Sequence, residues 1–307
     1  MNKKIDNNMS DEIFFSFIKE KTEIPDEIKT IYQYTNIEAL FNGIIVKEPK
    51  KKDDEICLWA SHYMYLNDPT EIEIGQKCFE ENLGHCIEGN NNNAKNDTIN
   101  DSEYFITSFS TTIDSLPMWS MYGRNGSGIA LGFDKDILRK EGNEVFLYKC
   151  VYLDKDVKDN IASFCENYKG EKLTKEDSKI LGIFVIIVLL VALYLETKTE
   201  KPFKELLDDS DIMYLFLFMM FAKDPAYNYE NEIRLLLQPD KDKIKYRCQN
   251  NLIIPYIENF FPKKALKEIW IGPTNDMERT EKSLRLYLDN KGFSDVKIYR
   301  SKVPYRK

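Results

Sequence analysis

Apolar and polar residues alternate with a period of two in many short stretches of this chain, a pattern typical of β-strands. In residues 105–110 one face is mostly apolar, whereas the other carries Ile106, Ser108 and Ser110. The same reasoning predicts strands at residues 31–35, 44–47, 58–61, 105–110, 129–133, 145–152, 229–237, 253–256, 268–271 and 296–299.

Helical spacing predicts helices at residues 13–18, 37–42 and 276–288, and a helical region at 154–223. A further short helix is expected after Ser115, with Pro117 in its first turn and Gly123 at its end. The apolar run 180–195 has 16 residues, fewer than the 18 or more expected of a membrane span. We expect it to be a buried helix and expect no membrane association.

Together these elements predict an α+β fold with a mixed, mainly antiparallel sheet and a helical insertion at about 154–223. Residues 1–30 are predicted to be an N-terminal helical extension, and residues 31–307 a single domain. The polar, repetitive segment 89–103 reads as a linker.

The predicted strand at 129–133 has one face that shows only Ala130 and Gly132, so either a ligand or a packed helix approaches it closely. The preceding helix carries Trp119 and Tyr122 on one large aromatic side. With the hydroxyl face of residues 105–110, these groups indicate half of a binding pocket. The alternative is that Trp119 is simply a core residue.

Composition supports a substantial core, because 43% of the 307 residues are hydrophobic. The net charge of −8, without a long basic block, argues against a general nucleic-acid platform, although a nucleic acid remains a conceivable target for modification. The six cysteines lack paired spacing, and the first residues do not resemble a signal peptide. We therefore expect reduced thiols and a cytoplasmic location.

A zinc site is not expected. Five potential ligands lie within 30 residues, but no C-x-x-C pair is present, and buried thiols are commoner. These potential ligands are Cys57, His62, Cys78, His85 and Cys86.

The predicted strand at 229–237 places Glu230, Glu232 and Arg234 on one face. A solvated salt ladder on an edge strand is one interpretation. The apolar end of the strand, residues 235–237, instead favours a central strand, on which such a row is a candidate for acid–base work or for stabilising a cation. Hydrolase-elbow and P-loop motifs are absent, which argues against serine hydrolases, kinases and P-loop enzymes.

The chain resembles an uncharacterised bacterial family called domain of unknown function 2971, with matching motifs across residues 31–306. These motifs are Tyr32-x-Tyr34, Asn67-Asp68-Pro69-x-Glu71, Ser108-Phe109-Ser110, Met118-Trp119-x-x-Tyr122, Gly128-Ile129-Ala130-x-Gly132-Phe133, Tyr229-x-x-Glu232-x-Arg234 and Ser301-Lys302-Val303-Pro304-Tyr305-Arg306. The family resemblance names no reaction. Turn chemistry with a helix cap is an alternative explanation of the motif at residues 67–71.

A second resemblance is to ADP-ribosyltransferases, which carry an Arg or His, then a Ser or Tyr, then a Glu on successive strands. Tyr34, Ser110 with Tyr122, and Glu230-x-Glu232 follow that order. Tyr34 departs from the pattern, because an aromatic residue cannot hold NAD as Arg or His does.

The second resemblance implies roles for these residues toward NAD as the substrate. Glu232 would stabilise an oxocarbenium-like transition state, and Glu230 would activate the acceptor. Ser110 would brace the ribose, and Trp119 or Tyr122 would stack on nicotinamide. The expected catalytic residues are Glu232, Glu230 and Arg234, and the expected NAD-binding residues are Tyr34, Ser108, Ser110, Trp119, Tyr122 and Asn67.

The sequence therefore predicts an ADP-ribosyltransferase-like enzyme that uses NAD, acting as a toxin or antiviral defence effector on a protein or nucleic-acid acceptor. One alternative is a non-catalytic sensor module that binds a nucleotide or peptide. Another is a metal-dependent nuclease built from Asp68, Glu71, Glu230 and Glu232, which requires those carboxylates to converge on one Mg²⁺.

Overall fold

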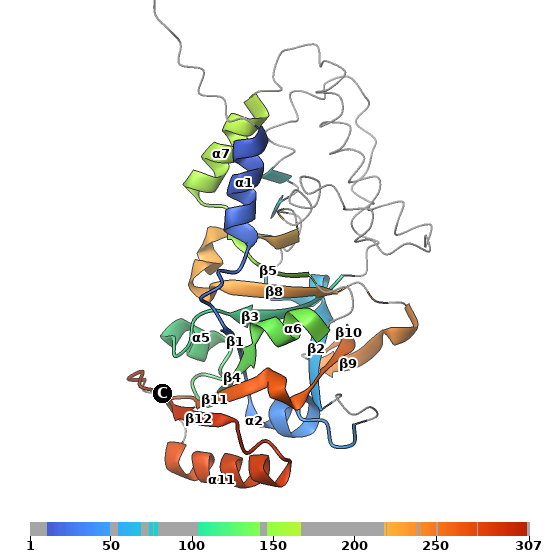
Figure 1. The fold of residues 1–307 in the computed structure, drawn as a ribbon, viewed down its shortest axis with the longest axis vertical. Coiled ribbons are helices and arrows are strands. Elements are labelled where there is room, and N and C mark those ends of the chain that lie inside the picture. Colours follow the sequence, from blue (N-terminus) through green and yellow to red (C-terminus); the bar gives the residue numbers. More distant parts are fainter. Residues whose placement is uncertain are drawn as a thin grey trace, which may run out of the picture. The chain divides into compact units, whose positions relative to one another are not determined.

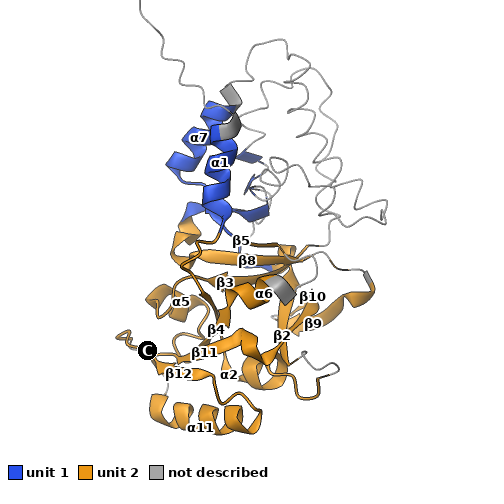
Figure 2. Cartoon of the chain, in the orientation of Figure 1, with its two compact units in different colours: residues 1–23, 66–103, 149–225 blue, residues 24–65, 104–148, 226–307 orange. Residues whose placement is uncertain are grey.

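The computed structural model describes residues 11–49, 55–68, 74–75, 77–78, 104–141, 146–166, 218, 220–237, 239, 241–249, 251–274 and 276–305. The chain divides into two compact units, each assembled from separate segments (Figure 2). Unit 1 comprises residues 1–23, 66–103 and 149–225, and unit 2 comprises residues 24–65, 104–148 and 226–307.

In unit 1, helices α1 (Asp11–Thr22) and α7 (Lys155–Glu166) pack through stacked rings of Phe14 and Phe164, whose centroids are 4.0 Å apart. Strand β6 (Val151–Tyr152) pairs in parallel with β7 (Ala222–Lys223). The prediction of helix throughout 154–223 is therefore wrong for residues 222–223, which form β7. A two-residue strand that pairs with a distant segment leaves no periodic pattern in the local sequence.

Within the described residues, no helix has both the length and the apolar character required to cross a membrane. The apolar run 180–195 lies outside the described residues, so its expected burial stays a prediction.

Unit 2 is built around a ten-stranded sheet with the order β12-β11-β4-β1-β3-β2-β10-β9, from which β8 and β5 branch at β3 (Figure 1). The strands are β1 (Thr30–Thr35), β2 (Ile56–His62), β3 (Phe105–Ser110), β4 (Ile129–Asp134), β5 (Phe146–Lys149), β8 (Glu232–Leu237), β9 (Lys245–Gln249), β10 (Leu252–Phe261), β11 (Leu266–Ile271) and β12 (Lys297–Arg300). β11 and β12 are parallel, whereas the pairings among β1, β2, β3, β4, β8, β9, β10 and β11 are antiparallel. An α+β fold with a mainly antiparallel sheet is thus confirmed.

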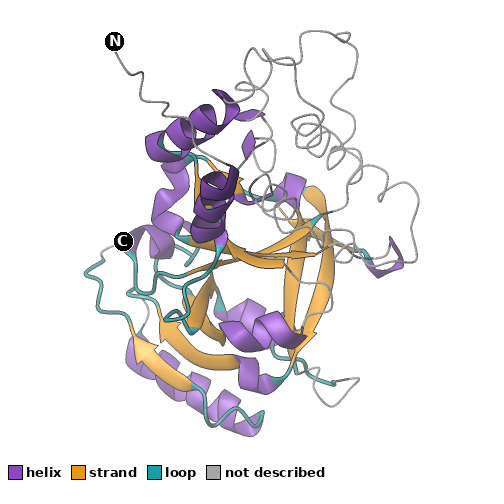
Figure 3. Cartoon of the chain, turned by 45° about the horizontal axis from the view of Figure 1, so that its top comes forward, coloured by secondary structure: helices purple, strands orange, loops and turns teal. Residues whose placement is uncertain are grey.

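Strand β3 connects the two parts of this sheet. One edge of β3 pairs with β8. The opposite edge pairs with β1 at Ser110 and with β2 at Phe105, so the sheet divides into two parts at this edge. Figure 1 shows β2 running steeply across the direction of β3 and β8, and Figure 3 shows the resulting curvature of the strands.

One face of the sheet carries the main hydrophobic core, with Ile31, Phe109, Leu131 and Ile233 from four neighbouring strands. Helices α6 (Lys135–Glu141) and α11 (Met277–Asn290) contribute Leu138 and residues of the α11 apolar side to this core. Asp276 caps α11 by accepting a hydrogen bond from the Arg279 amide (3.1 Å), which explains the predicted start of that helix.

The segment after β1 is helical as far as Ile44. Asn36 caps α2 (Ile37–Ala39) by accepting from the Ala39 amide at 2.8 Å, and the π-helical turn η1 (Leu40–Ile44) follows. The predicted strand at 44–47 is wrong, because Ile45 forms only an isolated bridge with Ile56. The remaining short 3-10 helices are η2 (Tyr63–Tyr65), η3 (Pro225–Glu230), η4 (Lys241–Lys243) and η5 (Lys263–Ala265).

Candidate functional site

The sheet face opposite the main core carries the candidate site. Ser110 of β3 is the cross-strand partner of Tyr32 on β1 and of Glu232 on β8. Ser108, which is exposed, is the partner of Arg234 in the same way. Because cross-strand partners point to the same face, these side chains form one polar group across three strands.

The predicted row of three charged residues on one strand is only partly present, because β8 begins at Glu232. Glu230 ends η3, and Asn231 adopts a left-handed conformation with φ 43°, which breaks the alternation. The Ser110 hydroxyl donates to the Glu230 carbonyl at 2.5 Å, and the Thr111 amide donates to the Asn231 carbonyl at 3.0 Å. These bonds hold Glu230 beside the end of β3.

Glu232 and Arg234 form a buried ion pair at 3.0 Å, with 3% and 0% of each residue exposed. β8 lies between β3 and β5, and all of its residues are buried. The central position is confirmed, and the interpretation as a solvated edge-strand ladder is wrong. The two opposite charges neutralise each other within the pair, so the buried Glu232 carboxylate is held in place by the Arg234 guanidinium.

Glu230 is also buried, and its carboxylate accepts a short hydrogen bond from the Tyr122 hydroxyl. Burial, and next the hydrogen bond to Glu230, raise the pKa of Tyr122 well above its usual value. Tyr122 therefore stays protonated at neutral pH and acts as the donor to the carboxylate. The fold thus brings Tyr122, Glu230, Glu232 and Ser110 together, from segments far apart in the sequence.

Helix α5 (Leu116–Met121) covers the bare part of this face. Ser115 is its N-cap residue without a capping side-chain bond, and Pro117 lies in its first turn, as predicted. Met118 and Trp119 of α5 cluster with Ala130. Of the two predicted occupants of the bare face, a ligand or a packed helix, the structure contains the helix.

Trp119 is fully buried, so the structure places it in the core and encloses both faces of its ring. Its ring meets the Tyr34 ring edge-on at 4.9 Å, and its indole N–H donates to Asp114 at 2.9 Å. Asp114 also accepts from the Ser301 hydroxyl and from the Lys302 amide (2.8 Å), which ties residues 301–302 to α5.

Tyr34 lies next but one to Tyr32 on β1, and its hydroxyl donates to the Thr112 carbonyl at 3.1 Å. Burial raises the pKa of Tyr34 to about 12. Its hydroxyl thus positions the loop after β3. Asn67 is exposed and belongs to unit 1, whereas the other predicted site residues belong to unit 2.

Sequence reasoning missed Asp114 and Glu268 as members of this face. Glu268 accepts hydrogen bonds from the Tyr32 hydroxyl (3.0 Å) and the Trp270 indole (2.9 Å). A side chain at Gly132 would approach Glu268 within 2.6 Å, so the absent side chain makes room for this contact. The absence of a side chain at Gly132 was the feature of the sequence that could have indicated a side chain such as Glu268 packed against this strand.

Among the described residues, no group of three or more His, Cys, Asp and Glu side chains is arranged to hold a metal ion. His85, Cys86 and Glu71 lie outside the described residues, and Asp68 belongs to unit 1. The zinc and nuclease alternatives therefore receive no support from the residues that the structure describes.

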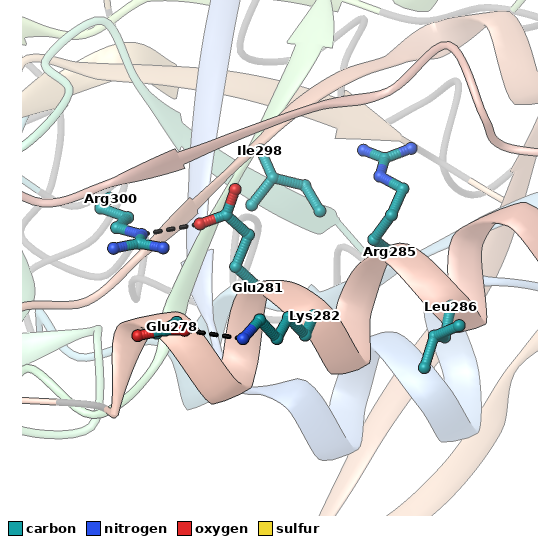
Figure 4. Close-up of a pocket in the computed structure, with 7 residues that line it drawn as sticks. All are labelled: Glu278, Glu281, Lys282, Arg285, Leu286, Ile298 and Arg300. Atoms are coloured by element: carbon teal, nitrogen blue, oxygen red, sulfur yellow. Dashed lines mark hydrogen bonds and ion pairs between the residues drawn. The ribbon is translucent and has the colours of Figure 1, made fainter.

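A broad hollow of about 740 Å³ lies between α11 and β12, away from the predicted residues (Figure 4). Two of its cations are paired with its own carboxylates, Lys282 with Glu278 and Arg300 with Glu281, each at 2.6 Å, and the third, Arg285, is paired with Asp289 of α11 at 3.3 Å. A surface whose cations all have carboxylate partners gives no sign of a particular ligand.

Residues 118–235 match the family described as Protein of unknown function (DUF2971). The matched segment contains the last four residues of α5, all of β4 and the first four residues of β8, and hence Tyr122, Glu230, Glu232 and Arg234. The resemblance is confirmed for this segment and does not extend over the whole of residues 31–306. No curated protein and no solved structure matches the chain.

Proposed function

We propose that this protein is an ADP-ribosyltransferase-like enzyme that cleaves NAD at its nicotinamide glycosidic bond. The observation that carries the proposal is the row across β1, β3 and β8, in which Ser110 lies between Tyr32 and Glu232. Ser110 and Glu232 on neighbouring strands supply the hydroxyl and the glutamate, in the order expected from the resemblance to ADP-ribosyltransferases.

The reaction breaks the bond between C1′ of the nicotinamide ribose and the ring nitrogen. The bonding electrons remain on that nitrogen, so nicotinamide leaves neutral and positive charge develops at C1′. The Glu232 carboxylate, oriented by Arg234 at 3.0 Å, stabilises this charge. Water or an acceptor hydroxyl then adds its oxygen to C1′ and loses one proton, which Glu230 accepts.

An acceptor on a protein or a nucleic acid would make the reaction a transfer, and water would make it a hydrolysis. Either outcome consumes NAD, and this is how the protein would act as a toxin or as an antiviral effector. In both cases Tyr122, which donates to Glu230, positions the carboxylate that receives the proton.

The test is NAD turnover by the purified full-length protein, with nicotinamide and ADP-ribose measured by mass spectrometry. Glu232→Asp keeps the charge beside Arg234 but withdraws the carboxylate, so we expect a folded protein with turnover reduced roughly 100-fold or more. Glu278→Gln is the matched control, because it removes an exposed carboxylate paired with Lys282 and should leave turnover unchanged.

Thermal unfolding of each variant shows whether it is folded. If Glu232→Asp is folded and retains parental turnover, this carboxylate takes no part in the reaction. If the parental protein does not consume NAD under any tested condition, the enzyme proposal fails.

The burial of Glu230 and Glu232, 4% and 3% exposed, favours a second candidate, a non-catalytic nucleotide-binding sensor module. In such a module the carboxylates would organise the sheet face instead of reacting. Calorimetric binding of NAD without any release of nicotinamide would support this candidate over the enzyme.

A further inference from the structure

A second polar and aromatic cluster lies on strands β2, β9 and β10. The guanidinium carbon of Arg247 lies 5.5 Å from the ring centroid of Trp59 and 5.5 Å from that of Tyr256. One nitrogen of the same guanidinium donates to the Ser61 hydroxyl at 2.8 Å. The cation is thus held in place by two rings and one hydroxyl.

Strand register places this cluster on the same sheet face as the candidate site. Tyr256 pairs with Ser61, and Ser61 pairs with Ile106 of β3. Ile106 points to the same side as Ser108, the partner of Arg234, because residues two apart on a strand share a face. The side chains from Trp59 to Glu232 therefore lie on one face of the sheet, on which Ile106, Arg234 and Glu232 are buried.

The charge of Arg247 has no counter-ion among the described residues. Lys245, its neighbour on β9, is paired with Glu258 at 2.6 Å, so that carboxylate is already engaged. The Nε of Arg247 is buried and finds no hydrogen-bond acceptor in the described part of the chain. Burial lowers the pKa of Arg247 from its usual value, which reflects the cost of keeping this cation partly dry.

Trp59 supplies an accessible aromatic surface beside this cation. It is 39% exposed, whereas Tyr256 beneath the guanidinium is only 8% exposed. Gly43 lies against the edge of the Trp59 indole, where an added Cβ would be 3.6 Å from the ring. An uncompensated guanidinium next to an exposed indole suits a ligand that has both a phosphate and a planar base.

We infer that Arg247 and Trp59 form a subsite for the adenosine-phosphate end of a nucleotide, with the phosphate on Arg247 and the purine on Trp59. The identification of that nucleotide as NAD rests on the proposed function. The Thr107 hydroxyl donates to the Trp59 carbonyl at 3.3 Å, which sets Trp59 alongside β3. Strand β2, which carries Trp59, is two strand spacings, about 10 Å, from β8. One dinucleotide can bridge this distance.

The test is titration of the full-length protein with AMP, adenosine and inorganic phosphate, followed by tryptophan fluorescence and calorimetry. Arg247→Gln should weaken AMP binding roughly tenfold to a hundredfold and leave adenosine binding unchanged. Trp59→Ala should weaken the binding of both AMP and adenosine. Arg300→Gln, which removes a cation paired with Glu281 near α11, is the control and should change neither.

Arg247→Lys keeps the positive charge if Arg247→Gln does not fold, and we expect it to bind AMP more tightly than Arg247→Met. If the parental protein does not bind AMP, or if all Arg247 variants bind it equally well, the subsite is disproved. AMP binding that depends on Arg247 in a protein that never consumes NAD would uphold the subsite and reject the proposed reaction. NAD turnover with a KM that is unaffected by Arg247 variants would uphold the proposed reaction and reject the subsite.

Discussion

At the scale of single residues, burial decides what Glu232 and Arg234 contribute. An exposed ion pair is worth about 0–1 kcal/mol, whereas removing one partner of a buried pair costs about 3–5 kcal/mol. Glu232 and Arg234 are almost completely buried, so Glu232→Gln leaves a guanidinium without its charge partner in a dry site. A loss of activity in that variant would partly report a loss of fold, and Glu232→Asp is therefore the sharper probe.

Trp119 illustrates the same point for an aromatic residue. Because it is fully buried and donates to Asp114, we expect Trp119→Ala to lower the free energy of unfolding by about 3–5 kcal/mol. Trp59→Ala should cost clearly less, since Trp59 is 39% exposed. Urea unfolding of both variants measures the difference. A Trp119→Ala protein with parental stability and weakened nucleotide binding would instead make Trp119 a wall of the binding site.

At the scale of elements, the sequence predicts those strands whose alternation is strong and local. β1, β3, β4 and β11 lie where the pattern places them, because one face of each is apolar, whereas the prediction at 253–256 covers only the first part of β10. β9 was missed because it is an exposed edge strand without an apolar face, and α6 was missed because it is short. The polar face could be predicted residue by residue, but its pairings could not, because register depends on segments more than 100 residues apart.

The start of β8 depends on the backbone conformation of Asn231, which the alternating sequence pattern did not indicate. Asn231 has φ 43°, and its side-chain amide donates to the Thr112 hydroxyl at 2.9 Å. Asn231→Val should cost roughly 1–3 kcal/mol of stability, because a β-branched residue is strained at positive φ. Asn231→Gly loses the amide contact but tolerates the backbone, so it should be the more stable variant in thermal unfolding. Equal stability of the two would mean that the turn does not constrain this residue.

At the scale of the whole molecule, the candidate site is a product of chain topology. Unit 2 is made of three separate segments, and β3 comes from the second while β8 comes from the third. The matched segment 118–235 contains residues of both units and only part of the sheet. A short linear motif therefore does not define the site, and a segment match alone would not have revealed the row through Ser110.

Hydrogen exchange on the full-length protein tests this arrangement over all strands at once. Amides of β4 and β8, whose residues are almost all buried, should exchange most slowly, and those of the exposed edge strand β9 most rapidly.

A nucleotide that spans the polar face from Glu232 to Trp59 should slow exchange in β2, β9 and the segment leading into β8. Exchange in α11 should not change, because the hollow beside it has neutralised charges and lies on other elements. AMP alone should protect β2 and β9 but not the start of β8, since it lacks the nicotinamide ribose. Protection confined to α11 and β12 would place the ligand in that hollow and remove both the subsite and the proposed reaction from the polar face.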